Sequence, residues 1–405
     1  MRKTLAFLLF LLPGLALAQG RLTGVVQDSV THQPLAFASV FLANTTLGAT
    51  TTEQGTFDFP KVPAGSYDVV GSYVGYRLAR QTIKVTEAPQ QLTLRLAPTA
   101  NQLGEVVVRP NPNRASDYQK FTQLFLGQST FSRQCSIRNP DDVLVDFDAE
   151  ANELTARAAK FVQVDNGALG YRVKYYGLRF TCNFTQQVVT FYGQPVFEEM
   201  TARSERQRRQ WDANREQAYR GSLAHFLRSV RDSQLTAQGF VARRLRIVPN
   251  PRFARTDSLR QALRRQRRAF SPAEMDSLGR WAQVPPSFAM LYTTPHHLDS
   301  LRRVAPGGRH VFLRFSDRLQ VTYLLEGPDA NYRPQPSRYA RRPAPPLAQD
   351  QQVSQLVLMQ REIEIEPNGQ LANPLAVFTD GYWGFEKMGE FLPVNYLPPA
   401  LFPHP

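Results

Sequence analysis

The feature that most constrains this chain is a series of short strand-like segments between Gly20 and Pro98, each bounded by turn residues. The apolar run Leu35 to Leu42 is typical of a buried strand, and Thr56 to Phe59 alternates like a half-buried one. Between them, Glu53-Gln54-Gly55 predicts a hairpin tip, because Gly can adopt a positive φ. Seven short strands at this spacing predict an antiparallel β-sandwich.

This region also carries a specific pattern of letters: G-x-V-x-D, P-L-x-x-A-S-V, T-T-x-x-G-x-F-x-F, V-P-x-G-x-Y and G-Y. The residues are Gly24, Val26, Asp28, Pro34, Leu35, Ala38, Ser39, Val40, Thr51, Thr52, Gly55, Phe57, Phe59, Val62, Pro63, Gly65, Tyr67, Gly75 and Tyr76. The pattern resembles the carboxypeptidase-regulatory-like domain, a transthyretin-like β-sandwich. The resemblance implies an accessory, non-catalytic module of the kind attached to peptidases or to TonB-dependent outer-membrane receptors of Bacteroidetes.

Residues 1–18 are expected to be a secretory signal peptide. Arg2 and Lys3 precede an apolar stretch, and Ala16-Leu17-Ala18 forms a small-residue cleavage site before Gln19. No later segment approaches the roughly 18 consecutive apolar residues of a transmembrane helix. We therefore predict an exported protein, in the periplasm or associated with the outer membrane, with no transmembrane segment in its mature chain.

The remainder divides into a linker, residues 99–112, and a larger α+β domain, residues 113–405. The run Leu103 to Val108 resembles the connector that follows the β-module in TonB-dependent receptors, but no plug motif follows it. The chain therefore shares only the front end of those receptors. Its C-terminal region resembles that of uncharacterised Bacteroidetes proteins with the same front module, which brings no known activity.

Periodicity within the larger domain predicts alternating β and α regions. We expect one long amphipathic helix from Glu198 to Leu235, and a helix from Pro272 that is capped by Ser271 and Glu274. The aromatic cluster at Gly381 to Glu386 is expected to pack as a C-terminal staple. The other expected helices are 121–131 and 257–270, and the expected strands lie in 142–158, 161–165, 170–184, 187–192, 311–325, 353–359 and 361–366.

Positive charge is concentrated in the middle of the chain. Residues 203–268 hold 18 basic and 5 acidic residues, a net charge of +13 beside +14 for the whole chain. Such a segment favours an anionic partner, such as lipid head groups or an acidic envelope polymer, or else forms a solvated helix face. Nucleic acid is not an expected partner of an exported protein. The candidate anion-binding residues are Arg203, Arg206, Arg208, Arg209, Arg264, Arg265, Arg267 and Arg268.

The two cysteines, Cys135 and Cys182, leave two alternatives open. In an oxidising compartment they form one disulfide that closes a large loop, or they remain two separate buried thiols. Their spacing matches neither a redox motif nor a zinc knuckle.

Searches for catalytic motifs identify no catalytic residue, and we expect no metal or cofactor. No histidine has Glu three or four residues later, as a metallocarboxypeptidase would need. His296-His297-Leu298-Asp299 is more typical of a polar loop than of a metal site, and His225 of a packed histidine. Asp146, Asp148 and Glu150 share one face of a strand, which suits an exposed face better than an acid–base pair.

The sequence therefore predicts an N-terminal transthyretin-like sandwich followed by a larger α+β domain. The function that we expect is that of a non-enzymatic cell-envelope protein, which acts by binding outer-membrane or other envelope proteins, or an anionic envelope polymer. The alternative is a peptidase- or glycan-directed hydrolase with an unrecognised active site in the C-terminal domain.

Overall fold

The computed structural model describes residues 19–99, 113–266, 269–334 and 350–399. These residues form two compact units. The first contains residues 19–99 together with residues 395–399, and the second contains the described residues from 113 to 394. The predicted signal peptide, the connector-like run Leu103–Val108, Arg267 and Arg268 lie outside the described residues.

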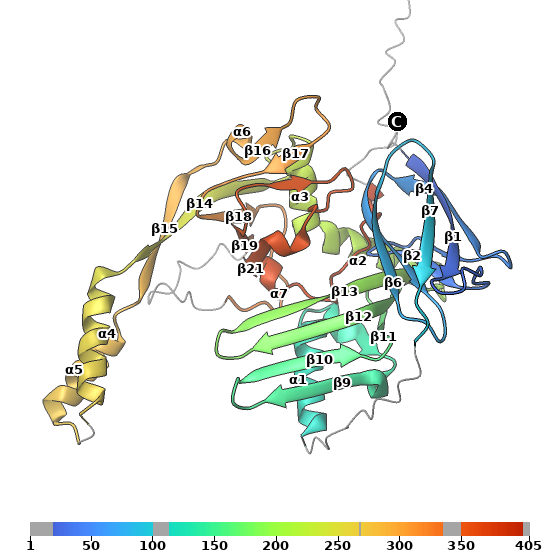
Figure 1. The fold of residues 1–405 in the computed structure, drawn as a ribbon. Coiled ribbons are helices and arrows are strands. Elements are labelled where there is room, and N and C mark those ends of the chain that lie inside the picture. Colours follow the sequence, from blue (N-terminus) through green and yellow to red (C-terminus); the bar gives the residue numbers. More distant parts are fainter. Residues whose placement is uncertain (1–18, 100–112, 267–268, 335–349, 400–405) are drawn as a thin grey trace, which may run out of the picture. The chain divides into compact units, whose positions relative to one another are not determined.

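The first unit is a β-sandwich of seven strands in two sheets, coloured blue to cyan in Figure 1. One sheet has the order β4-β1-β7 and the other the order β3-β2-β5-β6. Fully buried side chains such as Leu22, Leu42 and Leu94 fill its core. The strands are β1 (Gln19–Asp28), β2 (Ser39–Leu42), β3 (Gly48–Thr50), β4 (Thr56–Pro63), β5 (Gly65–Ser72), β6 (Ala79–Val85) and β7 (Gln90–Leu96).

The prediction of seven strands is confirmed, and Gly55 has the expected positive φ of 72°. The expectation of a purely antiparallel sandwich is wrong at one place, because β1 pairs with β7 in parallel, from Leu22↔Gln90 to Asp28↔Leu96. The physical reason is that β6 and β7 belong to different sheets. Their connection crosses between the sheets and brings β7 in beside β1, whereas a hairpin would have kept the two strands in one sheet.

Two of the patterned residues meet inside this unit. The carboxylate of Asp28 accepts hydrogen bonds from the backbone N–H groups of Val30 (2.7 Å) and Thr31 (3.0 Å). It also accepts one from the hydroxyl of Tyr76, at 2.7 Å. These bonds, that of Thr31 foremost, lower the pKa of Asp28. The Asp and the Tyr of the pattern therefore fasten the turn after β1 to a distant loop.

The first part of the second unit is a six-stranded antiparallel sheet with one helix on it. Its order is β8-β11-β12-β10-β9, and β13 pairs along β12. Helix α1 buries Phe121 and Phe125 against Phe180 and Tyr175, with ring centroids 5.1 and 5.6 Å apart. The elements are α1 (Arg114–Leu126), β8 (Cys135–Ile137), β9 (Val143–Asp148), β10 (Glu153–Ala158), β11 (Phe161–Asn166), β12 (Tyr171–Asn183) and β13 (Val188–Glu199), with short 3₁₀ turns at Ser132–Gln134 and Pro140–Asp142.

The second part contains a five-stranded sheet of order β15-β14-β18-β19-β21 and a three-stranded sheet of order β16-β17-β20. The core here is lined by Phe226, Phe240, Tyr323 and Trp383. Its elements are α2 (Glu205–Tyr219), α3 (Leu223–Arg231), β14 (Phe240–Pro249), α4 (Pro251–Arg264), α5 (Pro272–Ala282), β15 (Ser287–Pro295), α6 (Leu298–Leu301), β16 (Arg302–Val304), β17 (Val311–Leu313), β18 (Arg318–Tyr323), β19 (Gln352–Leu358), β20 (Ile363–Ile365), a 3₁₀ turn (Pro374–Ala376), β21 (Val377–Gly381) and α7 (Tyr382–Phe385).

The predicted long helix from Glu198 to Leu235 is wrong, because the segment contains the end of β13 and two helices, α2 and α3. The helices separate at Gly221, which has a φ of 75°. A Cβ atom there would lie 2.0 Å from the Oε1 of Gln352. Since only glycine fits this conformation in this space, the chain turns at Gly221 and starts a second helix capped by Ser222.

Candidate functional site

The predicted basic segment is divided between two places in the second unit (Figure 1). Arg206, Arg208 and Arg209 lie in the first turns of α2, just after Arg203, and all four are exposed. Arg264 ends α4, and Arg265 is its C-cap residue. Strand β14 separates the two groups along the chain. The described candidate arginines therefore belong to two separate elements, the start of α2 and the end of α4.

The buried face of α2 serves the fold. Its Trp211, Asn214 and Arg215 side chains donate hydrogen bonds to three successive carbonyls, those of residues 167, 168 and 169, at 2.7 to 2.9 Å. The guanidinium of Arg215 also lies 4.0 Å from the ring centroid of Tyr171. The sequence did not predict that Arg215 is buried and binds backbone carbonyls. The only sequence signal for it is its spacing of four residues from Trp211.

Helices α4 and α5 form an arm between the strands β14 and β15 (Figure 1). The pairing of β14 with β18 ends at Leu245, whereas its pairing with β15 continues to Pro249↔Ser287. The five-stranded sheet thus narrows to a two-stranded ribbon. Neither helix has a buried residue. We call residues 246–290 the helical arm. The predicted cap of α5 is confirmed as a capping box of Ser271 and Glu274.

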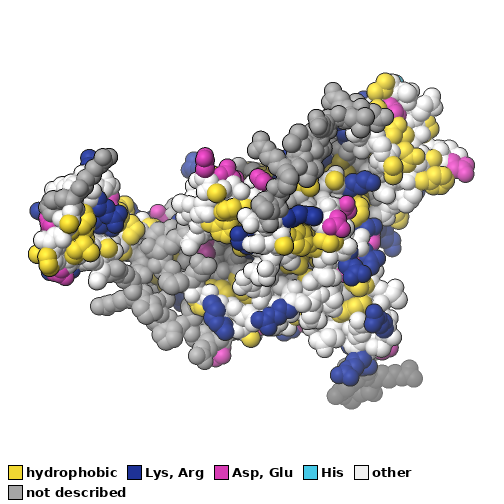
Figure 2. Space-filling view, turned by 90° about the horizontal axis from the view of Figure 1, so that it is seen from below, with side chains coloured by type: hydrophobic (Ala, Val, Ile, Leu, Met, Phe, Trp, Pro, Cys, Tyr) yellow, Lys and Arg dark blue, Asp and Glu magenta, His cyan; other side chains and the backbone are white. Residues whose placement is uncertain are grey.

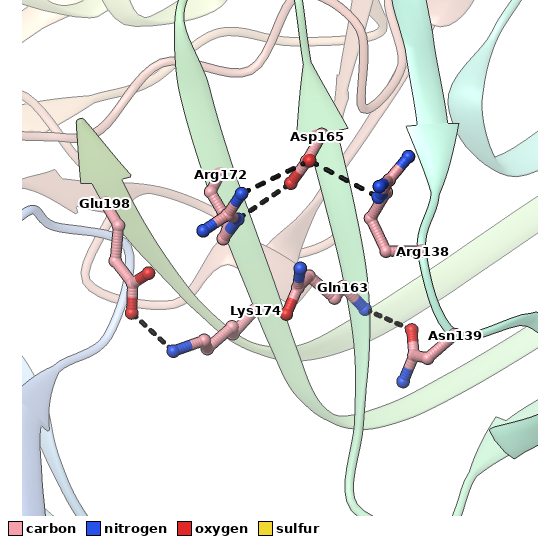
Figure 3. A network of polar contacts seen from close by, with 7 residues as sticks. All are labelled: Arg138, Asn139, Gln163, Asp165, Arg172, Lys174 and Glu198. Carbon is pink, nitrogen blue, oxygen red and sulfur yellow. Dashed lines mark hydrogen bonds and ion pairs between the residues drawn. The ribbon is translucent and has the colours of Figure 1, made fainter. Parts of the chain in front are cut away.

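A polar network covers one face of the six-stranded sheet (Figure 3). Asp165 on β11 contacts Arg172 at 2.8 Å and Arg138 at 3.5 Å. Lys174 on β12 contacts Glu198 on β13 at 2.6 Å. These positions alternate along the strands with buried Val162, Val164 and Val173. The charged groups are matched across neighbouring strands, so this network stabilises strand pairing.

The strongest cluster of perturbed ionisable groups lies where the C-terminal segment meets the end of α1. The hydroxyl of buried Ser129 donates to the Glu390 carboxylate, which also accepts from the backbone N–H of Lys387 at 2.9 Å. Burial raises the pKa of Glu390 to about 7 and raises that of Glu386 well above its ordinary value. Burial also lowers the pKa of Lys387.

A serine beside a carboxylate of raised pKa has the chemistry of a hydrolase, but its access to substrate decides what it can do. Ser129 is 2% exposed, and Ser132, which lies 3.0 Å from it, is 4% exposed. The backbone N–H groups of Met388 and Gly389 donate to the carbonyls of Phe125 and Leu126. The cluster therefore fastens residues 387–390 to α1 and leaves the serine hydroxyl out of reach of a substrate.

His225 is the packed histidine that the sequence predicts. Its ring lies 4.9 Å from that of Tyr219 and 4.8 Å from that of Phe240. Nδ1 accepts the N–H of Gly221 at 3.2 Å, so Nε2 carries the proton and donates to Gln238 Oε1 at 3.1 Å. Burial lowers the pKa of His225 to about 4.

These two groups predict opposing effects of pH on stability. In the unfolded chain His225 binds a proton below about pH 6.5, whereas in the folded chain it does so only below about pH 4. Protonation therefore favours the unfolded chain, and about 3 kcal/mol of the free energy of unfolding is lost as the pH falls through this window. Glu390 keeps its proton up to about pH 7 in the folded chain but loses it near pH 4.5 in the unfolded chain. Its contribution to the free energy of unfolding is therefore lost as the pH rises from about 4.5 to about 7. Urea unfolding across pH 4.5–7 measures both slopes.

The two matched variants separate these contributions. His225→Gln removes the His225 contribution, so its stability is expected to fall more steeply than that of the parent chain as the pH rises from about 4.5 to about 7. Glu390→Gln removes the Glu390 contribution, so its stability is expected to rise more steeply with pH than that of the parent chain over the same range. A variant whose pH dependence matches that of the parent chain would show that its assignment is wrong.

The described residues contain no group of three or more side chains suited to hold a metal ion. His297 and Asp299 lie 3.4 Å apart, but their side chains are 87% and 90% exposed. Asp146 and Asp148 are also exposed, as an outward strand face requires. No helix within the described part of the chain is both long enough and apolar enough to cross a membrane.

The two cysteines are free thiols, which agrees with the second alternative left open by the sequence and not with a disulfide. Cys135 is opposite Asn166 on β11, and Asn166 is opposite Tyr171 on β12. Cys182 is eleven residues beyond Tyr171 on β12, which corresponds to about 36 Å of strand at roughly 3.3 Å per residue. A disulfide needs Cα atoms within about 7 Å. Burial raises the pKa of Cys135 to about 12, which keeps that thiol unreactive.

Comparison with known families identifies the first unit. Residues 22–108 match the model of the CarboxypepD_reg-like domain. The chain therefore contains this domain, which accounts for about a fifth of its length. The match extends past the predicted boundary at Pro98 and includes the Leu103–Val108 run. A search of curated proteins found no match.

Several solved structures resemble parts of the chain. The backbone protein of pilus 2b from group B streptococcus is 17% identical over 20% of this chain and 42% of its own, with a TM-score of 0.19. The C-terminal domain of the shaft pilin SpaA from Lactobacillus rhamnosus GG is 16% identical over 20% of this chain and 98% of its own, with a TM-score of 0.17. A chain of a type II cohesin–X-dockerin complex from Acetivibrio cellulolyticus is 21% identical over 27% of this chain and 76% of its own, with a TM-score of 0.18. The chain spans less than half of the pilus backbone protein.

Proposed function

We propose that this protein is an exported, non-enzymatic protein of a bacterial cell envelope, which acts by binding or assembly. In this proposal the CarboxypepD_reg-like domain is a transthyretin-like accessory module, as in Bacteroidetes proteins with the same front end. The second unit supplies the contact surface. Its partners are envelope proteins or an anionic envelope component.

The predicted signal peptide supports export. Its cleavage site after Ala18 precedes strand β1, Gln19–Asp28, so cleavage would leave these residues of the strand in place. Leu22 and Val26 of this strand remain buried in the sandwich core.

The observation that carries the binding proposal is the helical arm together with the end of β15. Large apolar side chains on these elements are exposed, and the rest of the described chain does not cover them. The exposed side chains are Leu259, Met275, Phe288, Met290, Leu291 and Tyr292, each at 40% or more. Exposed apolar side chains gathered on one projecting element mark an interaction surface.

Fractionation and crosslinking in the native cells test this proposal. The full-length tagged chain is expected to be recovered with the envelope fraction, and crosslinking in intact cells is expected to capture envelope components reproducibly. A signal-deleted chain that starts at Gln19 is the control, because it should remain in the cytoplasm and capture none of them. Recovery of the full-length chain from the cytoplasmic fraction would overturn the proposal.

A further inference from the structure

Hydrogen bonds of Asn250 hold the base of the helical arm together. Asn250 is 5% exposed, and its side-chain oxygen accepts from the N–H of Arg252, which caps α4. Its side-chain nitrogen donates to the carbonyl of Pro285 at 2.8 Å, and its backbone N–H to that of Pro286 at 3.0 Å. This residue therefore closes the arm at the point where the chain leaves β14 and returns to β15. The arm is a formed element that presents a defined surface.

The charges of the arm are strongly unequal. Its described residues include seven arginines and three acidic residues, a net charge of +4. The acidic side chains are engaged within the arm, since Asp257 contacts Arg260 at 2.8 Å and Asp276 contacts Arg280 at 3.0 Å. Arg252, Arg255, Arg264 and Arg265 are all exposed. The arm therefore offers unneutralised positive charge to an anionic partner.

Apolar and basic side chains are interspersed on this arm (Figure 2, left). Met275, Leu278 and Ala282 follow one face of α5 at helical spacing, and Met275 is 57% exposed. On the ribbon, Phe288 and Met290 are 47% and 50% exposed. A partner that satisfies this surface must accept apolar groups and bind cations over the same area. An anionic bilayer does both, because its acyl boundary lies directly beneath its charged head groups.

We propose that the helical arm docks on anionic phospholipid bilayers, with its apolar side chains at the acyl boundary and its arginines among the head groups. An acidic protein would need apolar pockets matched to both faces of the ribbon and to α5, whereas a fluid bilayer adapts to them. The docking rests on the proposed envelope location, which gives the arm access to lipid. It goes further by naming the partner and the element that binds it.

Co-sedimentation of the purified chain that starts at Gln19 with vesicles tests this inference. We expect binding to vesicles rich in phosphatidylglycerol, at least tenfold weaker binding to pure phosphatidylcholine, and loss of binding at high salt. A variant with Arg252, Arg255, Arg264 and Arg265 changed to Gln is expected to bind at least tenfold more weakly. The double change M275S and F288S tests the apolar part and is expected to weaken binding further.

The matched control loses the same charge at another exposed place. Changing Arg203, Arg206, Arg208 and Arg209 to Gln is expected to alter vesicle binding less than threefold. A second arm variant replaces residues 250–286 by Asn-Gly, which can connect the antiparallel strands β14 and β15 next to the pair Pro249↔Ser287. A cooperative unfolding transition like that of the parent chain shows that each variant is folded.

Four outcomes would overturn the inference. The first three are no binding to anionic vesicles, equal loss in the arm and α2 variants, and a dimer without lipid that the arm variants abolish. The third would assign the arm to a second copy of this chain. Capture of one acidic envelope protein through the arm, without vesicle binding, would likewise overturn it. In that case, envelope fractionation still succeeds and the proposed function survives.

Discussion

Replacement of Gly221 by Ala is expected to lower the free energy of unfolding of the second unit by about 3 kcal/mol. The φ of 75° would cost an alanine about 1 kcal/mol. The added methyl group would lie 2.0 Å from Gln352 Oε1 and 2.8 Å from Tyr323, and such overpacking costs about 1–3 kcal/mol. Urea denaturation followed by tryptophan fluorescence measures the change. All three tryptophans lie in the second unit, so the signal reports on that unit alone.

Gly308→Ala is the matched control for this variant. Gly308 has a φ of 73°, but no atom lies within 4 Å of the place where its Cβ would stand. It is therefore expected to show only the conformational cost, about 1 kcal/mol. Equal losses in the two variants would contradict the claim that close packing separates α2 from α3.

The second large effect is expected at Trp383, which is 5% exposed in the core of the second unit. Trp383→Ala should destabilise this unit by about 4 kcal/mol, because it empties a space against Phe226, whose ring centroid lies 5.3 Å away. It also leaves the carbonyl of Gly221 without the indole N–H that now donates to it at 2.8 Å. Thermal unfolding by circular dichroism measures the loss.

Trp383→Phe serves as its control. The phenyl ring retains much of the packing but cannot donate a hydrogen bond to the carbonyl of Gly221. A loss of about 1–2 kcal/mol is expected. If Phe and Ala were equally destabilising, the hydrogen bond and not the packing would account for the effect of Trp383.

Local signals predicted many of the elements that the chain forms, but not the strands β8, β14, β15 and β21. The Ser271 and Glu274 cap of α5 and the Gly55 hairpin tip both depend on residues within a few positions of one another. The aromatic cluster at the end was also correctly expected to pack, since Tyr382 and Trp383 are buried. In each case the neighbouring residues determine the conformation.

The features that sequence reasoning missed depend on distant partners. The segment 311–325 does hold two strands, but β17 joins β20 and β18 joins β14, so they lie in different sheets. The acidic face of residues 362–366 meets partners on several elements. Glu362 pairs with Arg303 on β16, and Glu364 lies 2.6 Å from His310. Arg231 of α3 donates a hydrogen bond to the carbonyl of Ile365. No local pattern encodes which of several available arginines a carboxylate will meet.

The candidate binding site was predicted only in part. The charge count singled out the segment that contains α4, but it grouped these arginines with those of α2. Helical periodicity predicts that a segment is a helix, and does not say whether its apolar side is covered. The weak apolar patterning of α4, where arginines recur every three to five residues, is the one signal that could have marked it as uncovered.

The parallel pairing of β1 with β7 has a consequence for how the first unit acquires its structure. Leu22 and its partner Gln90 are 68 residues apart in the chain. Contacts of such long range are slow to form, because a long loop must close before they are made. During synthesis, the edge of β1 that β7 will cover stays unsatisfied until almost the whole domain has emerged. A nascent chain that ends before β7 is therefore expected to expose a strand edge to neighbouring chains, and only the complete domain removes that hazard.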